Sequence, residues 1–368
     1  MQSVSKRYIS LQKDDIYFQK FLAKDGVEYG LRFGTPEDAK SISMIYKEIY
    51  DYQYLNPVVY NLEFLKRELS DKSNIWFVGE LLENKEIAGI GLIEKERYIA
   101  HACRGAVRKK FQGLGVTTKI GAAGIITITK MPKFKDVLRL NSEVRGLKIG
   151  AQKLLKNSGA LPYGLVPAYL NYGDKRKYQI DDNKPFPSQR EEPAFLYSII
   201  FKKLWKKREK NIYLLDNDDF IFFYEFFKRM SGKMSEDVLI LENGKKNKNY
   251  ELYGVSKDYY NGMLKLYGYI KEKSLNNLLK VYSDWRIIIW KIPTTPLGLS
   301  SMSLAIDKGF KVVGYDVGFS NMNWTLYDSV ILVHYPKYNF DFLSVNSLDA
   351  TKPLLNKVKD IFLRDLPD

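Results

Sequence analysis

The stretch Val107-Arg-Lys-Lys-Phe-Gln-Gly-Leu-Gly-Val116 decides the fold of the first half of the chain. It carries Gly113 and Gly115 directly before 117–125, a segment of small residues that predicts a helix packed closely on a sheet. The residues before it, 98–107, have the pattern of a strand. Glycines leave the N–H groups of such a turn uncovered, and a helix N-terminus attracts anions. The turn therefore predicts a pyrophosphate-binding site.

Patterns on both sides of this turn predict an ordered series of elements. Thr35 as N-cap, Pro36 in the first turn and Asp38 three residues after the cap form a good helix start. The predicted order is strand, two helices, three strands, the glycine turn, helix, strand, helix and two strands. These elements cover 27–33, 36–49, 62–69, 75–82, 87–93, 98–105, 117–125, 137–141, 147–157, 159–167 and 194–201.

This order and the hexapeptide Lys110-Phe-Gln-Gly113-Leu-Gly115 resemble the GNAT superfamily of acyltransferases. The acetyl-CoA loop of that family consists of Arg or Gln, any two residues, Gly, any residue, and Gly or Ala. This chain differs from that pattern only at the first position, where it has Lys110. The resemblance implies an α/β (α+β) fold, with a mixed, mostly antiparallel sheet flanked by helices. It also implies that the strands before and after the loop helix splay apart, so that the pantetheine arm of CoA lies in the gap.

The resemblance implies acetyl-CoA, or another acyl-CoA, as the co-substrate. Backbone groups of the strand before the loop would bind pantetheine, and the loop itself would bind the pyrophosphate. The candidate cofactor-binding residues are Gly105, Val107, Lys110, Phe111, Gln112, Gly113, Leu114, Gly115 and Val116.

Three residues are candidates for the chemistry of acyl transfer, which needs a base for the amine and an acid for the leaving thiolate. His101 is a candidate base. Glu143 lies where carboxylates of this superfamily collect the amine proton through water, and Tyr163 is a candidate acid. Each has a structural alternative: a half-buried strand histidine, a solvated loop glutamate and a packed tyrosine. The tyrosine that serves as the acid in many family members falls at Leu155 here.

The second half contains glycine spacings that repeat those of the first. The matching pairs are Gly113/Gly159 with Gly262/Gly309, and Gly159/Gly164 with Gly309/Gly314. The segment 255–264 has one glycine where the phosphate loop would be, which predicts a degenerate second GNAT-like domain; chance matching is the alternative. We expect an N-terminal extension (1–26), an acyl-CoA-binding domain (27–203), a basic linker (204–211) and a degenerate C-terminal domain (212–368).

Composition excludes several other classes of protein. A single cysteine, Cys103, excludes an internal disulfide, and two histidines, His101 and His334, are too few for a zinc site. We expect no metal. The apolar run in 216–227 predicts a buried helix rather than a membrane anchor, and no stretch approaches the roughly 20 apolar residues of a spanning helix. The N-terminus lacks the apolar core of a signal peptide, so we expect a cytoplasmic protein without membrane contact.

The formal net charge of +15 favours polyanionic partners such as CoA, acyl carrier protein or tRNA. The lysine-rich stretches 201–210 and 244–248 are interpreted as solvated surface. Nucleic acid is not favoured, because no nucleic-acid-binding motif accompanies these lysines.

The residues and the resemblance together predict an acyl-CoA-dependent N-acyltransferase. It would transfer an acetyl group to a small-molecule, peptide or protein amine by direct attack in a ternary complex, with the acceptor between the two halves. The alternative is a non-catalytic module that binds CoA or an acyl carrier and recognises a partner through its C-terminal half.

Overall fold

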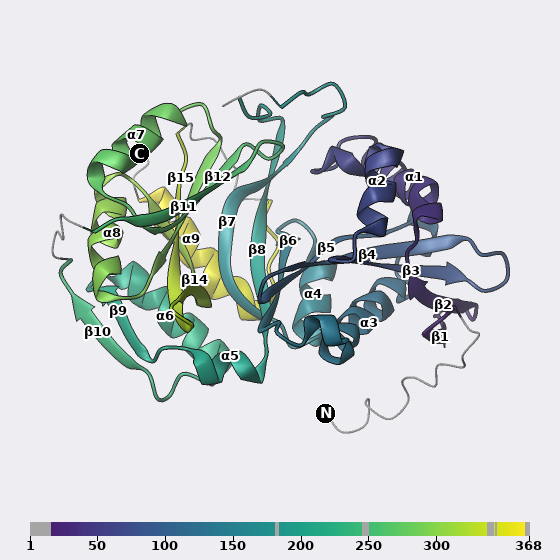
Figure 1. Cartoon of the computed structure of the whole chain (residues 1–368), viewed down its shortest axis with the longest axis horizontal. Helices are drawn as coiled ribbons and strands as arrows, with labels where there is room; N and C mark the ends of the chain where they lie inside the picture. The colour runs from purple at the N-terminus through teal and green to yellow at the C-terminus, as the bar shows by residue number, and fades with distance from the viewer. Residues whose placement is uncertain (1–15, 181–183, 245–249, 337–341, 343, 365–368) are drawn as a thin grey trace. The chain divides into compact units, whose positions relative to one another are not determined.

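The computed structural model describes residues 16–180, 184–244, 250–336, 342 and 344–364 (Figure 1). By its internal contacts the chain divides into two compact units, Met1–Ser142 and Glu143–Asp368. They are called unit 1 and unit 2 below, and each is described by itself. The domain boundaries expected from the sequence remain a prediction.

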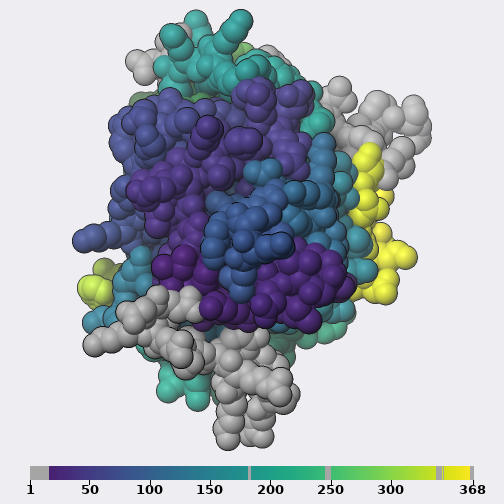
Figure 2. Space-filling view, turned by 90° about the vertical axis from the view of Figure 1, so that its right-hand side faces the viewer, coloured from purple at the N-terminus to yellow at the C-terminus, as the bar shows by residue number. Residues whose placement is uncertain are grey.

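The strands of unit 1 follow the order β1-β2-β3-β4-β5-β6, and every neighbouring pair is antiparallel except the parallel pair β5–β6. In Figure 1, α1 and α2 lie on one side of β3, β4 and β5, and α3 lies on the other. The N-terminal elements, coloured purple, cover much of the face in Figure 2. The elements are β1 (Gln19–Leu22), β2 (Glu28–Phe33), α1 (Ala39–Tyr50), α2 (Leu62–Ser70), β3 (Asn74–Leu81), β4 (Ile87–Glu96), β5 (Ile99–Val107), α3 (Val116–Lys130) and β6 (Arg139–Arg145).

The strands of unit 2 follow the order β8-β7-β14-β15-β13-β12-β11, and β9 and β10 form a separate parallel pair. All neighbours in the larger order are antiparallel except β12–β13. The elements are α4 (Ile149–Asn157), β7 (Leu161–Tyr172), β8 (Arg190–Ile200), α5 (Lys202–Lys207), β9 (Asn211–Leu215), α6 (Asp218–Ser231), β10 (Val238–Glu242), β11 (Leu252–Asp258), β12 (Met263–Tyr269), α7 (Glu272–Val281), β13 (Ile287–Pro293), α8 (Pro296–Asp307), β14 (Lys311–Met322), β15 (Thr325–His334) and α9 (Lys352–Leu363). The expected mixed, mostly antiparallel α/β fold with flanking helices is confirmed.

Helix α6 is the buried helix that the apolar run 216–227 predicts. Phe220, Phe223 and Phe227 are almost fully buried on it, and Asn217 caps its first turn by accepting a hydrogen bond from the N–H of Asp219 (2.9 Å). Over the residues that the structure describes, no helix combines the length and apolarity needed to cross a bilayer.

Local geometry in unit 2 recurs after 150 residues. The helix–strand corner has Gly159 at φ +81° in one copy and Gly309 at φ +77° in the other. The two strands that follow, β7 and β14, have register shifts at matching places: 162/164 and 166/170 on β7, and 312/314 and 316/320 on β14. They pair with one another at Gly164 and Gly314. This recurrence supports the proposed duplication.

One part of the predicted repeat is wrong. Gly262, aligned with the phosphate-loop glycine, lies in the turn between β11 and β12 with φ +60°. The segment before helix α7 is Ile270–Lys271 and has no glycine. The hairpin turn needs a residue in the left-handed conformation, and this need explains the glycine at position 262. The spacing from Gly262 to Gly309 therefore carries no information about a phosphate loop.

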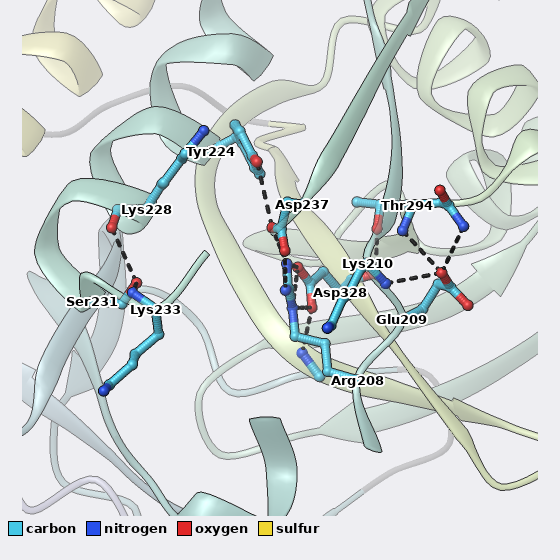
Figure 3. A network of polar contacts seen from close by, with 12 residues as sticks. Arg208, Glu209, Lys210, Tyr224, Lys228, Ser231, Lys233, Asp237, Thr294 and Asp328 are labelled. Atoms are coloured by element: carbon cyan, nitrogen blue, oxygen red, sulfur yellow. Dashed lines mark hydrogen bonds and ion pairs between the residues drawn. The ribbon is translucent and has the colours of Figure 1, made fainter. Parts of the chain in front are cut away.

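A second correction concerns the basic stretch 201–210, which was expected to be solvated. The side chain of Arg208 is 3% exposed, and its guanidinium donates to Asp237 (2.6 and 2.7 Å) and to Asp328 (Nε–Oδ1, 2.7 Å) (Figure 3). Asp328, which is fully buried, also accepts from the hydroxyl of Tyr315 (2.5 Å) and the N–H of Gly318 (2.8 Å). This network ties the end of α5 to β14 and β15. Of the second basic stretch, residues 245–248 lie outside the described residues.

Replacing Asp328 by Asn removes one charge that faces the buried guanidinium of Arg208. We expect Asp328→Asn to lower the free energy of unfolding by about 3 kcal/mol, because a buried cation then keeps one carboxylate partner instead of two. Denaturant unfolding measures this loss. Glu242→Gln, at the exposed end of β10, is the control and should change stability by less than about 0.5 kcal/mol. Equal stabilities of the two variants would contradict the structural role of the network.

The strand pair β7–β14 should not tolerate a side chain at Gly314. A Cβ there would lie 2.6 Å from the carbonyl oxygen of Tyr163 and 2.9 Å from Cα of Gly164. We expect Gly314→Ala to destabilise the protein by about 1–3 kcal/mol through overpacking. Gly150→Ala is the matched control, since a Cβ at this position of α4 would meet nothing within 4 Å; it should be neutral or stabilising. If Gly314→Ala leaves the free energy of unfolding unchanged, β7 and β14 can move apart to accept a side chain.

Candidate functional site

The glycine turn of unit 1 opens helix α3 without a side-chain cap. Gly113 has φ +82° and Gly115, the N-cap residue, has φ +93°, a region that favours glycine. No side chain caps the helix, and the N–H groups of its first turn have no acceptor within the helix. A Cβ at either glycine would meet nothing within 4 Å. The turn therefore combines an uncapped helix start with two glycines that no neighbouring atom crowds, as an anion-binding site requires.

The turn is held in place from α1 and from its own flanks. The carboxylate of Glu48 accepts from the N–H of Lys109 (2.8 Å) and pairs with the guanidinium of Arg108 (3.2 Å). The amide of Gln112 donates to the carbonyl oxygen of Val107 (3.2 Å). These contacts fix the backbone before the glycines, so little reorganisation is needed when a ligand binds.

The predicted cofactor-binding residues divide into anchors and exposed groups. Phe111 is buried and makes an edge contact with Tyr29, with ring centroids 6.1 Å apart. Val116 is also buried. The side chain of Lys110, at the first motif position, is 60% exposed and forms a 2.8 Å ion pair with Glu86. Phe111 and Val116 therefore anchor the turn in the protein interior, whereas Lys110 presents a positive charge to solvent.

Strand β5 bends directly after its pairing with β6 ends. The two strands pair only from Ile99 with Arg139 to His101 with Asn141. On the other side of β5, the register with β4 shifts between residues 103 and 106, so two residues of β5 stand opposite one of β4, a β-bulge. This bulge lies where the resemblance implies that the strands splay apart.

Arg104 sits in this bulge with φ +53°, an unusual conformation for a residue other than glycine. Its carbonyl oxygen accepts a hydrogen bond from the hydroxyl of Tyr46 (2.6 Å), and its guanidinium pairs with Glu94 (3.1 Å) and Glu68. Burial raises the pKa of Tyr46, which remains a neutral donor. The bulge is thus stabilised from both helices and from β4.

The three predicted catalytic residues occupy three strands. His101 is the last residue of β5 that pairs with β6, and it is partly exposed. Glu143 lies on β6, directly after Ser142, whose hydroxyl donates to the carbonyl oxygen of Ala102 on β5 (2.8 Å). Tyr163 lies on β7 and is 3% exposed. Its burial favours the packed-tyrosine alternative, and the three catalytic roles remain predictions.

Unit 2 also contains a polar group that sequence patterns did not reveal. Burial raises the pKa of Tyr169 on β7, and the neighbouring Tyr169 raises the pKa of Lys265 on β12. Tyr169 and Glu143 come from the first half of the chain, whereas Lys265 comes from the second. The only sequence mark was the alternation of Lys265 with buried apolar residues along β12, which does not identify a partner on a distant strand.

The second half lacks the features of the glycine turn. Strands β12 and β13 pair over five residues, from Met263 with Ile287 to Tyr267 with Lys291, and β11 pairs with β12 without a register shift. The segment between β12 and α7, Ile270–Lys271, contains no glycine. These differences support the interpretation of a degenerate second domain.

Metal chemistry has no candidate group in the described residues, where no three His, Cys, Asp or Glu side chains cluster suitably for an ion. His334 is partly buried, and burial lowers its pKa. It therefore favours the neutral form, consistent with a packed histidine.

No protein-family model and no curated protein matches the chain. Over about half its length, the chain is similar to solved GNAT acetyltransferases. One is an acetyltransferase of the GNAT family from Streptococcus pneumoniae, with 18% identity, 47% of this chain and 99% of that chain covered, and a TM-score of 0.35. Another is the ribosomal-protein-S5-alanine acetyltransferase from Vibrio fischeri (16% identity; 51% and 98% covered; TM-score 0.39). A third is a putative acetyltransferase from Salmonella typhimurium, solved with its cofactor acetyl-CoA (13% identity; 47% and 93% covered; TM-score 0.35).

The glycine turn predicts a sharp difference between two aspartate substitutions. Gly113 (φ +82°) and Gly159 (φ +81°) have the same conformation, and a Cβ at either would meet nothing within 4 Å. Gly113→Asp and Gly159→Asp should therefore cost similar stability, about 1–2 kcal/mol. Only Gly113→Asp places a carboxylate beside the predicted phosphate donors. It should weaken acetyl-CoA binding at least about tenfold, since one hydrogen bond to a charged group contributes about 1.5–3 kcal/mol.

Isothermal titration calorimetry with acetyl-CoA measures this difference, and thermal unfolding supplies the stability control. Equal affinities for the two variants would exclude the turn as the pyrophosphate site.

Proposed function

We propose that the chain is an acyl-CoA-dependent N-acyltransferase that transfers an acetyl group from acetyl-CoA to an amine. The observation that carries the proposal is the uncapped start of α3, with two left-handed glycines beside open space, following a strand that bends where its pairing with β6 ends. In an acyl-CoA, the diphosphate would bind at the start of α3, and the extended pantetheine arm would bind along the bent strand β5.

Cofactor binding would use backbone groups at both places. The N–H groups from Gly113 to the first turn of α3 would donate to the pyrophosphate, with Lys110 adding positive charge. The pantetheine amides would hydrogen-bond along β5 near Gly105 and Val107, as an added strand does at a sheet edge. A side chain at Gly105 would meet nothing within 4 Å, so this part of β5 is open.

The chemistry needs one proton acceptor and one proton donor. The amine nitrogen attacks the thioester carbonyl carbon, the C–N bond forms, and the C–S bond breaks to release the CoA thiolate. Glu143 would take the amine proton through water, and His101 is the second candidate for this role. The thiolate is a moderate leaving group, because free thiols have a pKa of about 8.5. It can leave as the anion where Leu155 replaces the usual tyrosine.

The acceptor would be a small molecule or the amine of a peptide or protein, and an acyl carrier protein is an alternative donor. Leu155, in place of the acid common in the resembled family, favours a second candidate function: a module that binds CoA or an acyl carrier without turnover.

Release of CoA thiol from acetyl-CoA, with and without amines, tests the proposal. We expect thiol release that depends on an amine, and Glu143→Gln should lower kcat about a hundredfold, because loss of a general base typically removes 10²–10⁴ of the rate. The affinity for acetyl-CoA should not change. Glu96→Gln, at the exposed end of β4, is the matched control and should retain full activity.

The outcomes separate the two candidates. Tight acetyl-CoA binding without amine-dependent thiol release from any acceptor would favour the binding module. If Glu143→Gln keeps full activity and His101→Gln loses activity, His101 is the general base. Absence of acetyl-CoA binding would contradict both functions.

A further inference from the structure

Strand β11 is an open edge of the sheet in unit 2. It pairs with β12 along its whole length, Leu252–Asp258, and among the described residues no strand pairs with its other side. Its counterpart in unit 1 is β4, because each of these two strands is antiparallel to a neighbour that is parallel to the next strand. Strand β4 is covered by β3, whereas β9 and β10, the strands that precede β11, pair with each other. Strand β11 therefore lacks the neighbour that its counterpart has.

This edge also lacks the features by which proteins usually protect an open strand, which are short length, proline, bulges and several charges. Strand β11 has seven residues, no proline and no register shift against β12. Three of its apolar side chains are exposed: Leu252 (55%), Val255 (40%) and Tyr253 (39%). A long, regular and partly apolar edge of this kind can accept a further strand through its backbone.

Side chains alternate along a strand, so one face of this segment carries Glu251, Tyr253, Val255 and Lys257. Contacts with α7 support this assignment at both ends. The carboxylate of Glu251 accepts from the N–H of Lys271, the N-cap residue of α7 (3.0 Å). The ammonium of Lys257 lies 5.1 Å from the ring centre of Tyr282, at the other end of the helix. The face therefore presents an acid, two apolar side chains and a base in order.

This order is complementary to itself when the strand is reversed. In an antiparallel pair of identical strands related by a twofold axis, one residue faces its own copy, and residues equally far from it face each other. With Gly254 at the centre, Glu251 of one copy faces Lys257 of the other, and Tyr253 faces Val255. Opposite charges and aromatic–β-branched pairs are favourable across strands, and each pair occurs twice.

The neighbouring registers lose this match. Centring the pair on Tyr253 places Glu251 opposite Val255, and centring it on Val255 places Leu252 opposite Asp258. Both place a charged side chain opposite an apolar one. The charge and apolar pattern of the edge therefore favours one occupant, a second copy of β11, in one register.

We propose that two copies of the chain pair antiparallel through β11, with Gly254 at the twofold axis, so that the sheet of unit 2 continues across the dimer. This inference goes beyond the proposed function and does not depend on it, since it uses no residue of the candidate functional site. A single strand pair buries less surface than a standard interface of about 1,600 Å², so we expect a dissociation constant of about micromolar order.

Charge reversal at the paired positions tests the proposal. In sedimentation velocity over about 1–100 μM, the unchanged protein should shift from one chain, 42.8 kDa, towards twice that mass. Glu251→Lys and Lys257→Glu should each weaken self-association at least about tenfold, because like charges then face each other twice. A mixture of the two variants should associate like the unchanged protein, because every facing pair again has opposite charges. Recovery in the mixture also shows that both variants are folded.

Lys273→Glu, on the exposed side of α7, is the matched control, because it changes the net charge as Lys257→Glu does; it should associate like the unchanged protein. A protein that stays monomeric over the whole concentration range would overturn the inference. So would a dimer that persists in both charge-reversed variants, since its contact would lie elsewhere. Failure of the mixture to associate, when each variant alone is monomeric, would contradict the register centred on Gly254.

Discussion

The close approach of β7 and β14 is the constraint on which unit 2 depends. Gly164 and Gly314 pair directly, and a Cβ at either would press on the opposite backbone at 3.0 Å or less. The two strands can approach this closely only because both residues are glycines without side chains. The strands on either side follow as β8 beside β7 and as β15, β13, β12 and β11 beside β14. Because this junction makes the sheet of unit 2 continuous, strands from distant parts of the chain, β7 and β14, become neighbours.

The two halves of the chain have diverged in what their equivalent strands can bind. Strand β5 has a bulge, a short register with β6 and a glycine turn after it, whereas β12 is regularly paired on both sides and leads into α7 through Ile270–Lys271. Regular pairing satisfies the backbone groups that a pantetheine arm would need. The described second half therefore has no equivalent of the glycine turn that precedes α3.

The sequence predicted features that depend on neighbouring residues. The glycine turn, the helix start at Thr35 and the order of elements all follow from local conformational preferences. Features that depend on distant contacts were missed. The bulge at Arg104 was not predicted, although Gly105 beside it is compatible with one, because the partners that compensate its strain, Tyr46 and Glu68, lie on helices far away in the chain. Arg208, in a lysine-rich stretch, gave no sign of its buried carboxylates, and Gly262 misled because a hairpin turn selects glycine as strongly as a phosphate loop does.

The bulge at Arg104 has a kinetic consequence. Tyr46 and the two glutamates keep β5 bent in a molecule without ligand. Entry of the proposed thioester would then need no prior separation of paired strands. Such a step would slow association and would weaken the apparent affinity, because only the molecules in the open form could bind. Encounter of a polyanion with this positively charged protein would instead be governed by diffusion and ionic strength. Capture should accordingly be fast at low salt and decline as salt screens the attraction.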